Sequence, residues 1–416
     1  MDHSPHSAAD SAPAPPAFDR DVCVIGGGGH VGLPFAMICA ESGLKTVIYD
    51  TDRAKVAQIA AGKMPFLEDG ADELLPRVLA SGRLEVTADP QMERCRFLVM
   101  IIGTPVDAHL NPSFSALQRA IDACRDHLRD GHVLIVRSTV FPGTSERLER
   151  HLREELKLDV RVACCPERVA QGKSLEEFRT LPQLVSAFDP ATLEAVKGLF
   201  GRFCPELVEM APLEAELCKL MTNSWRYLQF AAVNQFYMLA SDHDVDFERI
   251  LHGCRHNYPR MSGMPGPGLT AGPCLVKDTL QLAAFSNNQF VLGHAAMLIN
   301  EGLPAHLVKL ARHQTDLAGK TVGILGMGFK AESDDPRDSL SYKLKHLLAL
   351  EAGPVLCHDP YVPDARLVPL ERLLAEAEVI FVGTPHRMYR TLTIPPGKIV
   401  IDVWNCLPSP ASADPA

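Results

Sequence analysis

The chain has 416 residues, of which 46% are hydrophobic and 22% are charged, and its formal net charge is -10. This length and composition predict a globular protein of two or three domains, and the negative charge argues against nonspecific attraction to nucleic acid or anionic lipid. No apolar run is long enough to span a membrane, and residues 1–20 lack the basic-then-apolar order of a secretory signal. We therefore expect a cytoplasmic protein that has no membrane or nucleic-acid partner.

The twelve cysteines, from Cys23 to Cys406, do not form a recognisable metal or disulfide pattern. None makes a C-x-x-C pair, and none lies near a histidine at zinc-finger spacing. Cys164 and Cys165 are adjacent, which is poor geometry for a disulfide or a chelate. We expect no metal site, and most of these cysteines should be buried as small hydrophobic residues in a reducing compartment.

The first third of the folded chain predicts a parallel, doubly wound sheet. It follows a tail, residues 1–18, whose Ala, Pro, Ser and His content predicts disorder. Short apolar segments then alternate with a helical segment, and this alternation is typical of such a sheet. The expected helix is 33–42, and the expected strands are 21–25, 46–50, 97–102 and 133–136.

The middle and the end of the chain predict a helical region followed by a second sheet. A helical pattern without Gly or Pro runs from about Leu213 to Asp242, which suits a strut between domains or a dimer seam. Further strands are expected at 320–328, 355–360, 379–385 and 399–402. We expect an α/β fold of two Rossmann-like, doubly wound domains (19–211 and 313–408) joined by a helical central domain with a long helix (212–312).

A glycine-rich turn after the first strand predicts a dinucleotide site. In Gly27-x-Gly29-x-x-Gly32 the glycines allow a tight turn and let the backbone approach a pyrophosphate at a helix N-terminus. Asp50 ends the next strand, where a carboxylate binds ribose hydroxyls and repels a 2′-phosphate. The alternative is a turn made only for close packing. Strand, helix and acid together favour NAD as the cofactor, rather than NADP.

A cysteine motif predicts a nucleophile. In Gly272-Pro273-Cys274-x-x-Lys277-Asp278 the Gly-Pro pair is a plausible helix start, so Cys274 should lie in the first turn, where the helix dipole favours a thiolate. Lys277 and Asp278 should share its helix face, where the lysine stabilises anions and the aspartate moves a proton. A buried cysteine beside a surface Lys/Asp pair is the other interpretation of this spacing.

On the long helix, Lys219 and Asn223 lie one turn apart on one face. Such residues usually lie on a solvated face, but their neighbours include apolar Met221 and Trp225, which makes partial burial plausible. A partly buried lysine can have a depressed pKa and act as a base. We regard Lys219 and Asn223 as candidate members of a catalytic site.

Two more polar segments are candidates for the same site. Glu167, in Cys-Pro-Glu-Arg at 165–168, follows a strand end, where a carboxylate is well placed for acid–base work. Lys330 and the loop 334–338, which carries Arg337, follow a strand of the second sheet and could contact phosphate or sugar. By themselves these segments could also be a helix cap and a charged loop.

Taken together, these motifs resemble the UDP-glucose/GDP-mannose dehydrogenase family over nearly the whole folded chain, from about Asp21 to Cys406. The resemblance rests on the order of the motifs as well as on each one. The matching segments are Val31-Gly32-Leu33-Pro34, Gly103-Thr104-Pro105, Ser138-Thr139-Val140-x-Pro142-Gly143-Thr144, Pro166-Glu167-Arg168, Glu216-Leu217-x-Lys219-x-x-x-Asn223, Gly272-x-Cys274-x-x-Lys277-Asp278, Phe329-Lys330, Asp334-Asp335-x-Arg337 and His358-Asp359-Pro360.

The resemblance implies a role for each matched residue. The nucleophile would be Cys274, with Lys219, Glu167 and Asp278 handling protons and Asn223 positioning a water or oxyanion. NAD would contact Gly27, Gly29, Gly32, Asp50, Lys55, Thr104, Thr139 and Arg337. The sugar nucleotide would contact Arg260, Lys277, Phe329 and Lys330. In the family the arginine that matches Arg260 reaches across a dimer, so a homodimer with the long helix as its seam is implied.

The implied reaction is a four-electron oxidation of the sugar C6 alcohol to a carboxylate, with one hydride passing to each of two NAD molecules. Cys274 would attack the intermediate aldehyde, and water would hydrolyse the resulting thioester. The segment from Arg260 to Cys274, with Pro-Gly-Pro-Gly at 265–268, resembles members that oxidise UDP-N-acetylhexosamines of the ManNAc or GlcNAc type. The ending Val276-Lys277-Asp278 resembles members that oxidise UDP-glucose, which is the alternative substrate.

The sequence departs from the family pattern at a few places, and two other functions compete. Gln171 stands where many members have a second acid, and Ala271 precedes Gly272 where two glycines are frequent. A hydroxyacid dehydrogenase of the phosphogluconate type would need neither Cys274 nor a second Rossmann-like domain. A non-catalytic NAD or nucleotide-sugar binder would be expected to have lost part of the set Glu167, Lys219, Cys274 and Asp278.

Overall fold

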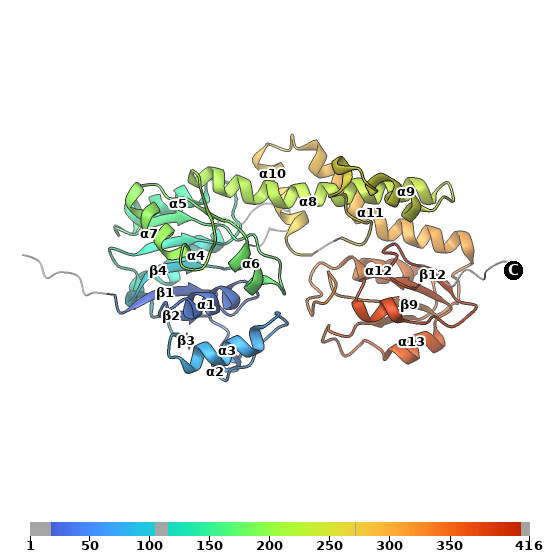
Figure 1. The fold of residues 1–416 in the computed structure, drawn as a ribbon, viewed down its shortest axis with the longest axis horizontal. Coiled ribbons are helices and arrows are strands. Elements are labelled where there is room, and N and C mark those ends of the chain that lie inside the picture. The colour runs from blue at the N-terminus through green and yellow to red at the C-terminus, as the bar shows by residue number, and fades with distance from the viewer. Residues whose placement is uncertain (1–17, 105–114, 271, 409–416) are drawn as a thin grey trace, which may run out of the picture.

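The computed structural model describes residues 18–104, 115–270 and 272–408. Two parallel sheets lie side by side, and a long helix runs along both of them (Figure 1). Of the expected tail, residues 1–17 lie outside the described chain. Phe18 lies within it, and the Arg129 guanidinium is 4.1 Å from the centre of its ring.

The N-terminal sheet has six parallel strands in the order β3-β2-β1-β4-β5-β6. Its strands are β1 (Arg20–Ile25), β2 (Thr46–Tyr49), β3 (Leu84–Thr87), β4 (Cys95–Met100), β5 (Val133–Val136) and β6 (Arg161–Cys164). Alternate residues of β1 point to opposite cores, Val22 and Val24 to one face and Cys23 and Ile25 to the other. Burial on both faces explains why the central strands are continuous apolar runs.

Helices cover both faces of this sheet, as the alternating pattern predicts. They are α1 (Gly32–Glu41), α2 (Arg53–Ala60), α3 (Ala71–Ala80), α4 (Ser115–Ala123), α5 (Thr144–Arg150), α6 (Ser174–Thr180) and α7 (Pro190–Phe200). A two-stranded parallel sheet, β7 (Gln183–Val185) and β8 (Leu207–Glu209), follows β6. The edge strand β3, which is half polar, was not identified from the sequence pattern.

The central region is built around α8 (Pro212–Ser241), whose 30 residues span about 45 Å. The expected helix 213–242 is therefore confirmed within one residue at each end. Its first half contacts β6 and α5, and its second half packs Tyr237 and Met238 against the C-terminal core. It also packs against the three other helices of this region, which are α9 (Phe247–Arg255), α10 (Leu275–Phe285) and α11 (Val291–Gln314).

The C-terminal unit has four parallel strands in the order β10-β9-β11-β12. The strands are β9 (Val322–Leu325), β10 (Val355–His358), β11 (Val379–Val382) and β12 (Ile399–Ile401), and the helices are α12 (Leu340–Glu351) and α13 (Leu370–Glu376). The fold class expected from the sequence is confirmed: two parallel α/β units and a helical centre. No helix in the described parts of the chain has the length and apolar character needed to cross a membrane.

Candidate active site

The glycine turn between β1 and α1 is packed on one side and open on the other. A Cβ on Gly32 would lie 2.7 Å from the Gly27 Cα, and a Cβ on Gly27 would lie 2.9 Å from the Ile48 Cγ2 atom. A Cβ on Gly29 would meet nothing closer than the Gly26 carbonyl oxygen at 3.8 Å. A side chain at Gly27 or Gly32 would therefore not fit in this tight turn, while the turn at Gly29 leaves room for a pyrophosphate.

Asp50 and Lys55 lie beside this turn. One carboxylate oxygen of Asp50 accepts the Gly28 N–H at 2.9 Å, and the other accepts the Asp52 N–H at 3.0 Å. Asp50 is partly exposed, and each of its oxygens retains accepting capacity for a ribose hydroxyl. The Lys55 side chain passes close to Gly28, with its Nζ 3.9 Å from Asp52.

The loops after β4 and β5 connect the cofactor turn to α10. The Thr104 hydroxyl donates to the Thr139 carbonyl at 2.6 Å, and Lys277 Nζ donates to the carbonyl and the hydroxyl of Thr104 at 3.3 and 3.1 Å. Thr104, Thr139 and Lys277, three candidate ligand contacts from distant parts of the sequence, therefore lie next to one another. Pro105, the next residue of the Gly-Thr-Pro motif, lies outside the described residues.

Cys274 is the one exposed cysteine among the twelve, all of which lie in the described chain. It is the N-cap of α10, one position before the first turn in which it was expected. Although part of the residue is open to solvent, packing around the thiol raises its pKa, and the charge of Asp278 adds to this rise. Lys277 and Lys219 act in the opposite direction. The expected dipole-stabilised thiolate is thus corrected, since burial and Asp278 outweigh the nearby cations.

The polar face of α8 turns towards α10. Lys219 is 8% exposed and Asn223 5%, and the Asn223 amide donates to the Asp278 carboxylate at 2.6 Å. Lys277 lies 3.5 Å from the other carboxylate oxygen of Asp278. Burial of Lys219 and Asn223 agrees with expectation, but its cause differs. Trp225, one of their apolar neighbours in the sequence, is 62% exposed, and burial comes from packing of α10 on α8.

Glu167 follows β6 and joins this group. Its charge acts on the Cys274 thiol, and its buried Oε1 has no hydrogen-bond partner among the described residues. The backbone before it is held by a buried cation that the sequence pattern did not reveal. Arg137 donates to the Cys165 carbonyl at 3.1 Å and to Gln183 at 2.9 Å, and Gln183 donates to the Pro166 carbonyl at 3.2 Å.

Three phenylalanine rings surround the Arg137 guanidinium. Their centres lie 4.7 to 5.3 Å from its central carbon, and they belong to Phe35, Phe178 and Phe200. Burial lowers the pKa of Arg137, although an arginine stays charged in such surroundings. A buried arginine directly after a continuous apolar strand looks like an ordinary strand end in the sequence, and only its neighbours reveal its role.

Glu216 attaches α8 to the N-terminal unit. Its buried carboxylate accepts the Gly143 N–H at 2.6 Å and the Ser145 N–H and hydroxyl at 2.8 and 2.7 Å, where α5 begins. Burial raises the pKa of Glu216. These bonds satisfy free N–H groups at a helix N-terminus. They also set the register of Lys219 relative to the cofactor sheet.

The C-terminal unit reaches the same site through Phe329 and Lys330. The Phe329 ring packs on Gly272, where a Cβ would lie 2.5 Å from the ring and where φ is +107°. Lys330 Nζ donates to the carbonyl of Gln171 in the N-terminal unit, and burial lowers the pKa of Lys330. Ala271 lies outside the described residues.

Of the two candidate arginines, Arg337 lies near the site and Arg260 does not. Arg337 pairs with Asp335 at 2.6 Å, and both charges act on the imidazole of His30 in the glycine turn. Arg337 therefore faces the proposed cofactor turn from the second unit. Arg260 is exposed and lies against Tyr258, with its guanidinium 5.7 Å from the ring centre. The single chain does not bring Arg260 to Cys274, so its role across a dimer stays a prediction.

These residues form two parts of one site: a cluster of ionisable side chains around the Cys274 thiol, and the glycine turn after β1. Lys219, Lys277, Asp278 and Glu167 all lie near enough for their charges to act on the Cys274 thiol. Among the described residues, no three His, Cys, Asp or Glu side chains are arranged to hold a metal ion. The arrangement can therefore bind a dinucleotide beside a nucleophilic thiol that has proton donors and acceptors around it.

Models of three domains of the UDP-glucose/GDP-mannose dehydrogenase family match the chain. The NAD binding domain matches residues 20–204, the central domain 213–301 and the UDP binding domain 323–409. Among curated relatives, a UDP-N-acetyl-D-mannosamine dehydrogenase of Pyrococcus horikoshii is 28% identical over 400 residues, which cover 92% of this chain and 95% of that protein.

Solved structures with the same architecture include two dehydrogenases. A UDP-D-ManNAc dehydrogenase from Pyrococcus horikoshii has a TM-score of 0.87 and 27% identity, covering 94% of this chain and 97% of that one. A UDP-glucose dehydrogenase from Pyrobaculum islandicum has a TM-score of 0.85 and 28% identity, covering 94% and 95%.

Proposed function

We propose that this chain oxidises the C6 alcohol of UDP-N-acetyl-D-mannosamine through Cys274. The chain belongs to the UDP-glucose/GDP-mannose dehydrogenase family and is an NAD-dependent nucleotide-sugar dehydrogenase. One observation carries the role of Cys274. It is the exposed cysteine of the chain, and four ionisable side chains of the site act on its thiol. The other cysteines are buried or partly buried.

The glycine turn is the proposed site of NAD, and its geometry fits that cofactor. Gly29 leaves space above the turn, and Asp50 offers a partly exposed carboxylate at the position of the adenosine ribose. When bound, NAD supplies the hydride acceptor for each of the two oxidation steps. The residues proposed to hold it are Gly27, Gly29, Gly32, Asp50, Lys55, Thr104, Thr139 and Arg337.

The residues around Cys274 supply the remaining chemistry. The thiolate attacks the aldehyde carbon made by the first oxidation, which forms a carbon–sulfur bond. After the second oxidation the adduct is a thioester, and attack by water breaks this bond and releases the carboxylate and the thiol. Asn223, fixed by its bond to Asp278, positions the water or the oxyanion. Lys219 and Asp278 move protons beside the sulfur.

Glu167 is the proposed acid–base group on the side of the N-terminal unit. Its buried Oε1 is unpaired in the described chain, so it can bind a hydroxyl or water proton of the reacting group. Phe329, Lys330 and Lys277 are proposed to hold the UDP-sugar, and their contacts bring together all three parts of the chain. The proposed domain boundaries are 19–211, 212–312 and 313–408.

The choice of sugar is supported by relatives and by the loop before Cys274. The relative from Pyrococcus horikoshii acts on UDP-N-acetyl-D-mannosamine according to its name, and Pro-Gly-Pro-Gly at 265–268 resembles members that act on UDP-N-acetylhexosamines. UDP-glucose is the second candidate, because the structure from Pyrobaculum islandicum is a UDP-glucose dehydrogenase with nearly the same similarity.

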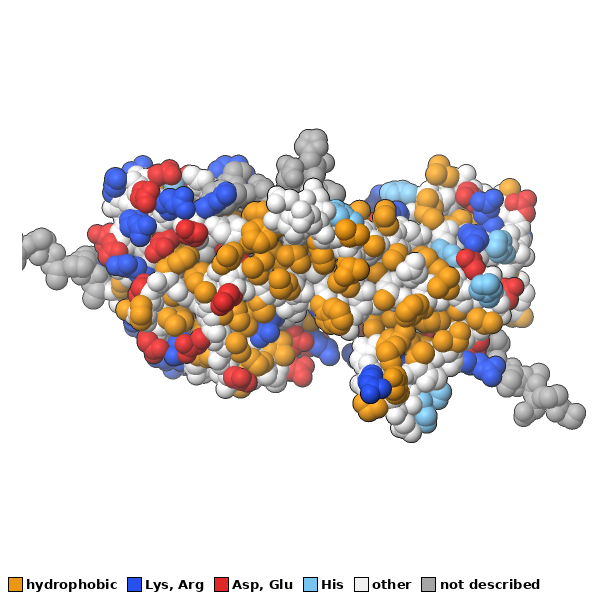
Figure 2. Space-filling model, turned by 90° about the horizontal axis from the view of Figure 1, so that it is seen from above, with side chains coloured by type: hydrophobic (Ala, Val, Ile, Leu, Met, Phe, Trp, Pro, Cys, Tyr) orange, Lys and Arg blue, Asp and Glu red, His pale blue; other side chains and the backbone are white. Residues whose placement is uncertain are grey.

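A homodimer in the cytoplasm is the proposed working form. Apolar side chains gather in a band along the face that carries α8 and α11 (Figure 2). The exposed ones on these helices are Leu213, Met221, Trp225, Phe236, Leu239, Val291, Leu292 and Leu298. A band of this kind marks a protein interface, and Arg260 would reach the partner's site from it. Twelve unpaired cysteines support a reducing compartment.

The test is the amount of NADH formed per sugar consumed, with UDP-ManNAc, UDP-GlcNAc, UDP-glucose and GDP-mannose in turn. We expect two NADH per UDP-ManNAc, and loss of turnover in Cys274→Ala but not in the control Cys254→Ala, which changes a partly buried cysteine on α9. One NADH per sugar in the wild type would contradict the thioester route. NAD binding without turnover on any of the four sugars would favour a non-catalytic binder.

A further inference from the structure

The loop that carries Phe329 and Lys330 turns sharply at Glu332. Glu332 has φ +54°, the left-handed region that residues with a Cβ seldom adopt. A strained backbone of this kind persists only where the surroundings hold it, and it often marks a functional constraint. The turn comes two residues after Lys330, so it decides where the preceding side chains point.

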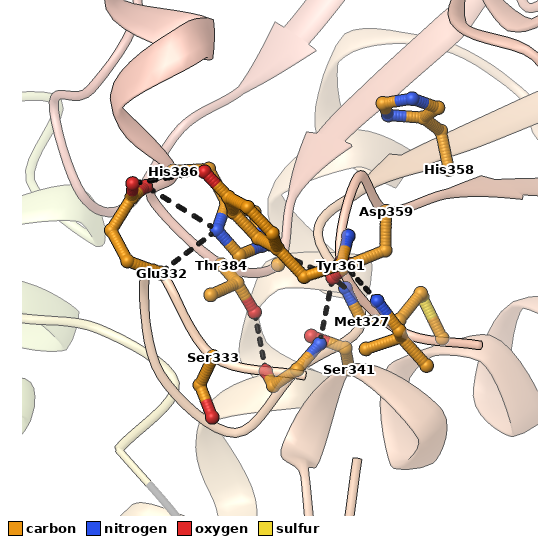
Figure 3. A network of polar contacts seen from close by, with 12 residues as sticks. Met327, Glu332, Ser333, Ser341, His358, Asp359, Tyr361, Thr384 and His386 are labelled. Atoms are coloured by element: carbon orange, nitrogen blue, oxygen red, sulfur yellow. Dashed lines mark hydrogen bonds and ion pairs between the residues drawn. The ribbon is translucent and has the colours of Figure 1, made fainter. Parts of the chain in front are cut away.

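Three hydrogen bonds hold Glu332 in this conformation. Its N–H donates to His386 Nδ1 at 3.1 Å, and its carboxylate accepts the Tyr361 hydroxyl at 3.0 Å and the Arg387 N–H at 2.8 Å. Figure 3 shows the Glu332 and His386 side chains close together at the carboxyl edge of the second sheet. His386 is fully buried, so Glu332 is anchored to the interior of the unit.

His386 is itself oriented by Asp359. Its Nε2 lies 3.0 Å from an Asp359 oxygen that also accepts the Met327 N–H at 2.7 Å and the Gly328 N–H at 2.9 Å. Because that oxygen is an acceptor, Nε2 carries the ring proton, which leaves Nδ1 free to accept from Glu332. The imidazole therefore links the turn after β9 to the loop that leaves it.

The other side of this loop meets the rest of the site. The Phe329 ring covers Gly272, two residues before Cys274, and Lys330 reaches the Gln171 carbonyl in the N-terminal unit. His386 makes none of these contacts itself. It acts at Glu332, and a shift of that turn would move both side chains away from Gly272 and Gln171.

We propose that His386 is a positioning residue for the nucleotide of the sugar substrate: by holding the strained turn at Glu332, it sets the places of Phe329 and Lys330. This inference rests on the proposed function, because it takes Phe329 and Lys330 as nucleotide contacts. His386 does not touch the reacting atoms. Its loss should change the affinity for UDP and leave the NAD turn, on the other sheet, unaffected.

The experiment titrates UDP and NAD into the full chain for wild type, His386→Leu and His386→Gln. In His386→Leu we expect UDP to bind about tenfold more weakly, the effect of one lost buried hydrogen bond, with KM of the UDP-sugar raised to match. NAD affinity should change less than UDP affinity, because Arg337 is the one proposed NAD contact in this loop, and kcat should change little. His386→Gln should recover most of the UDP affinity, because its amide oxygen can accept from Glu332 while its NH₂ donates to Asp359.

His358→Gln is the matched control. His358 lies on the same sheet edge and bonds to Tyr389 at 2.9 Å, but it points away from the Glu332–His386 pair (Figure 3). Its UDP affinity should equal that of the wild type. Unchanged UDP affinity in His386→Leu, or no recovery in His386→Gln, overturns the proposal. If His386→Leu does not fold, His386→Asn replaces it, since the shorter amide cannot reach both Glu332 and Asp359. Equal UDP affinity of the Asn and Gln variants would then overturn the proposal.

Amide hydrogen exchange separates this inference from the proposed function. The peptide that contains Lys330 and Glu332 should exchange faster in His386→Leu than in wild type or His358→Gln. An unchanged rate would contradict the positioning role whether or not UDP is the ligand. If wild type binds no UDP, but the peptide still exchanges faster in His386→Leu than in wild type, the result would instead count against the proposed substrate.

Discussion

In both parallel-sheet units, the strand that follows the first glycine turn ends at an acid: Asp50 follows β2 and Asp359 follows β10. Both acids bind backbone N–H groups of the turn beside them. Asp50 is partly exposed and accepts two such bonds. Asp359 is 8% exposed and accepts four backbone N–H groups as well as a bond from His386.

The helix after each turn differs in the same sense. In the first unit α1 begins at Gly32, within the glycine motif itself. In the second unit α12 begins only at Leu340, and residues 329–339 occupy the space between the turn and the helix. The first unit thus keeps a helix N-terminus and a carboxylate free for a dinucleotide. In the second unit the Asp359 carboxylate and the N–H groups of the turn are bonded to each other, and the loop 329–339 is the part that can contact a ligand.

The largest effect should follow from removing the acid of the second unit. Asp359→Ala leaves several buried N–H groups and His386 without an acceptor, so we expect the free energy of unfolding to fall by about 3–5 kcal/mol. Asp50→Ala removes a partly exposed acceptor and should cost about 1 kcal/mol or less. Urea unfolding of both variants measures the difference. Equal losses would contradict the division of roles between the two acids.

The pH dependence of the free energy of unfolding should also distinguish Asp359 from Asp50. Burial by itself would raise the pKa of Asp359, but the bonds from His386 and from backbone N–H groups hold it well below its usual range. A depressed carboxyl pKa adds stability above the unfolded value, near pH 4, and this stability is lost as the pH falls further. Asp359→Asn should flatten the loss between pH 4 and 2 by up to about 1.4 kcal/mol per pH unit, as measured by urea unfolding. An unchanged slope would show that Asp359 is not the group responsible.

A smaller effect is expected on cofactor binding. Asp50→Ala removes the proposed partner of the ribose hydroxyls, so NAD affinity should fall by about tenfold or somewhat more. Discrimination against NADP should fall as well, because the charge that repels a 2′-phosphate is gone. Fluorescence titration with both dinucleotides measures this. The control is Asp52→Asn, which alters a neighbouring acid at the start of α2. A loss of NAD affinity in the control equal to that in Asp50→Ala would argue against a specific role of Asp50.

The smallest effect concerns the thiol between the two units. Burial and the charge of Asp278 raise the pKa of Cys274, so thiolate forms only as the pH rises towards that value. Asp278→Asn removes one cause, and alkylation of Cys274 by iodoacetamide at pH 8 should become a few-fold faster. Lys277→Met should have the opposite effect because it removes a cation. Both variants reacting like the wild type would mean that these charges do not control the thiol.

Much of the fold could be predicted because it rests on local periodicity. The strand β5 and the helix α8 stand out as an apolar run and as a long stretch without Gly or Pro. The site was harder to predict. Lys219 and Asn223 were identified by their spacing, yet the expected reason for their burial was wrong, because Trp225 is exposed and α10 does the covering.

Some residues gave no sequence pattern that could have revealed them. Arg137 looks like the polar end of a strand, and its bond to the Cys165 carbonyl depends on a segment 28 residues away. His386 directly follows Gly383-Thr384-Pro385, and no local pattern marks it as a functional residue. Its contact with Glu332 joins residues 54 apart in the chain.

The sequence by itself determined the alternating α/β pattern of the two sheet units, the long central helix, the glycine turn with Asp50 and the candidate cysteine, because each depends on residues near in the chain. Only the tertiary structure decided that Cys274 is the exposed cysteine, that its pKa is raised, and that Asp359 is saturated while Asp50 is not. Burial, charge and hydrogen-bond saturation arise from segments that packing brings together. Spacing along one chain cannot state them in advance.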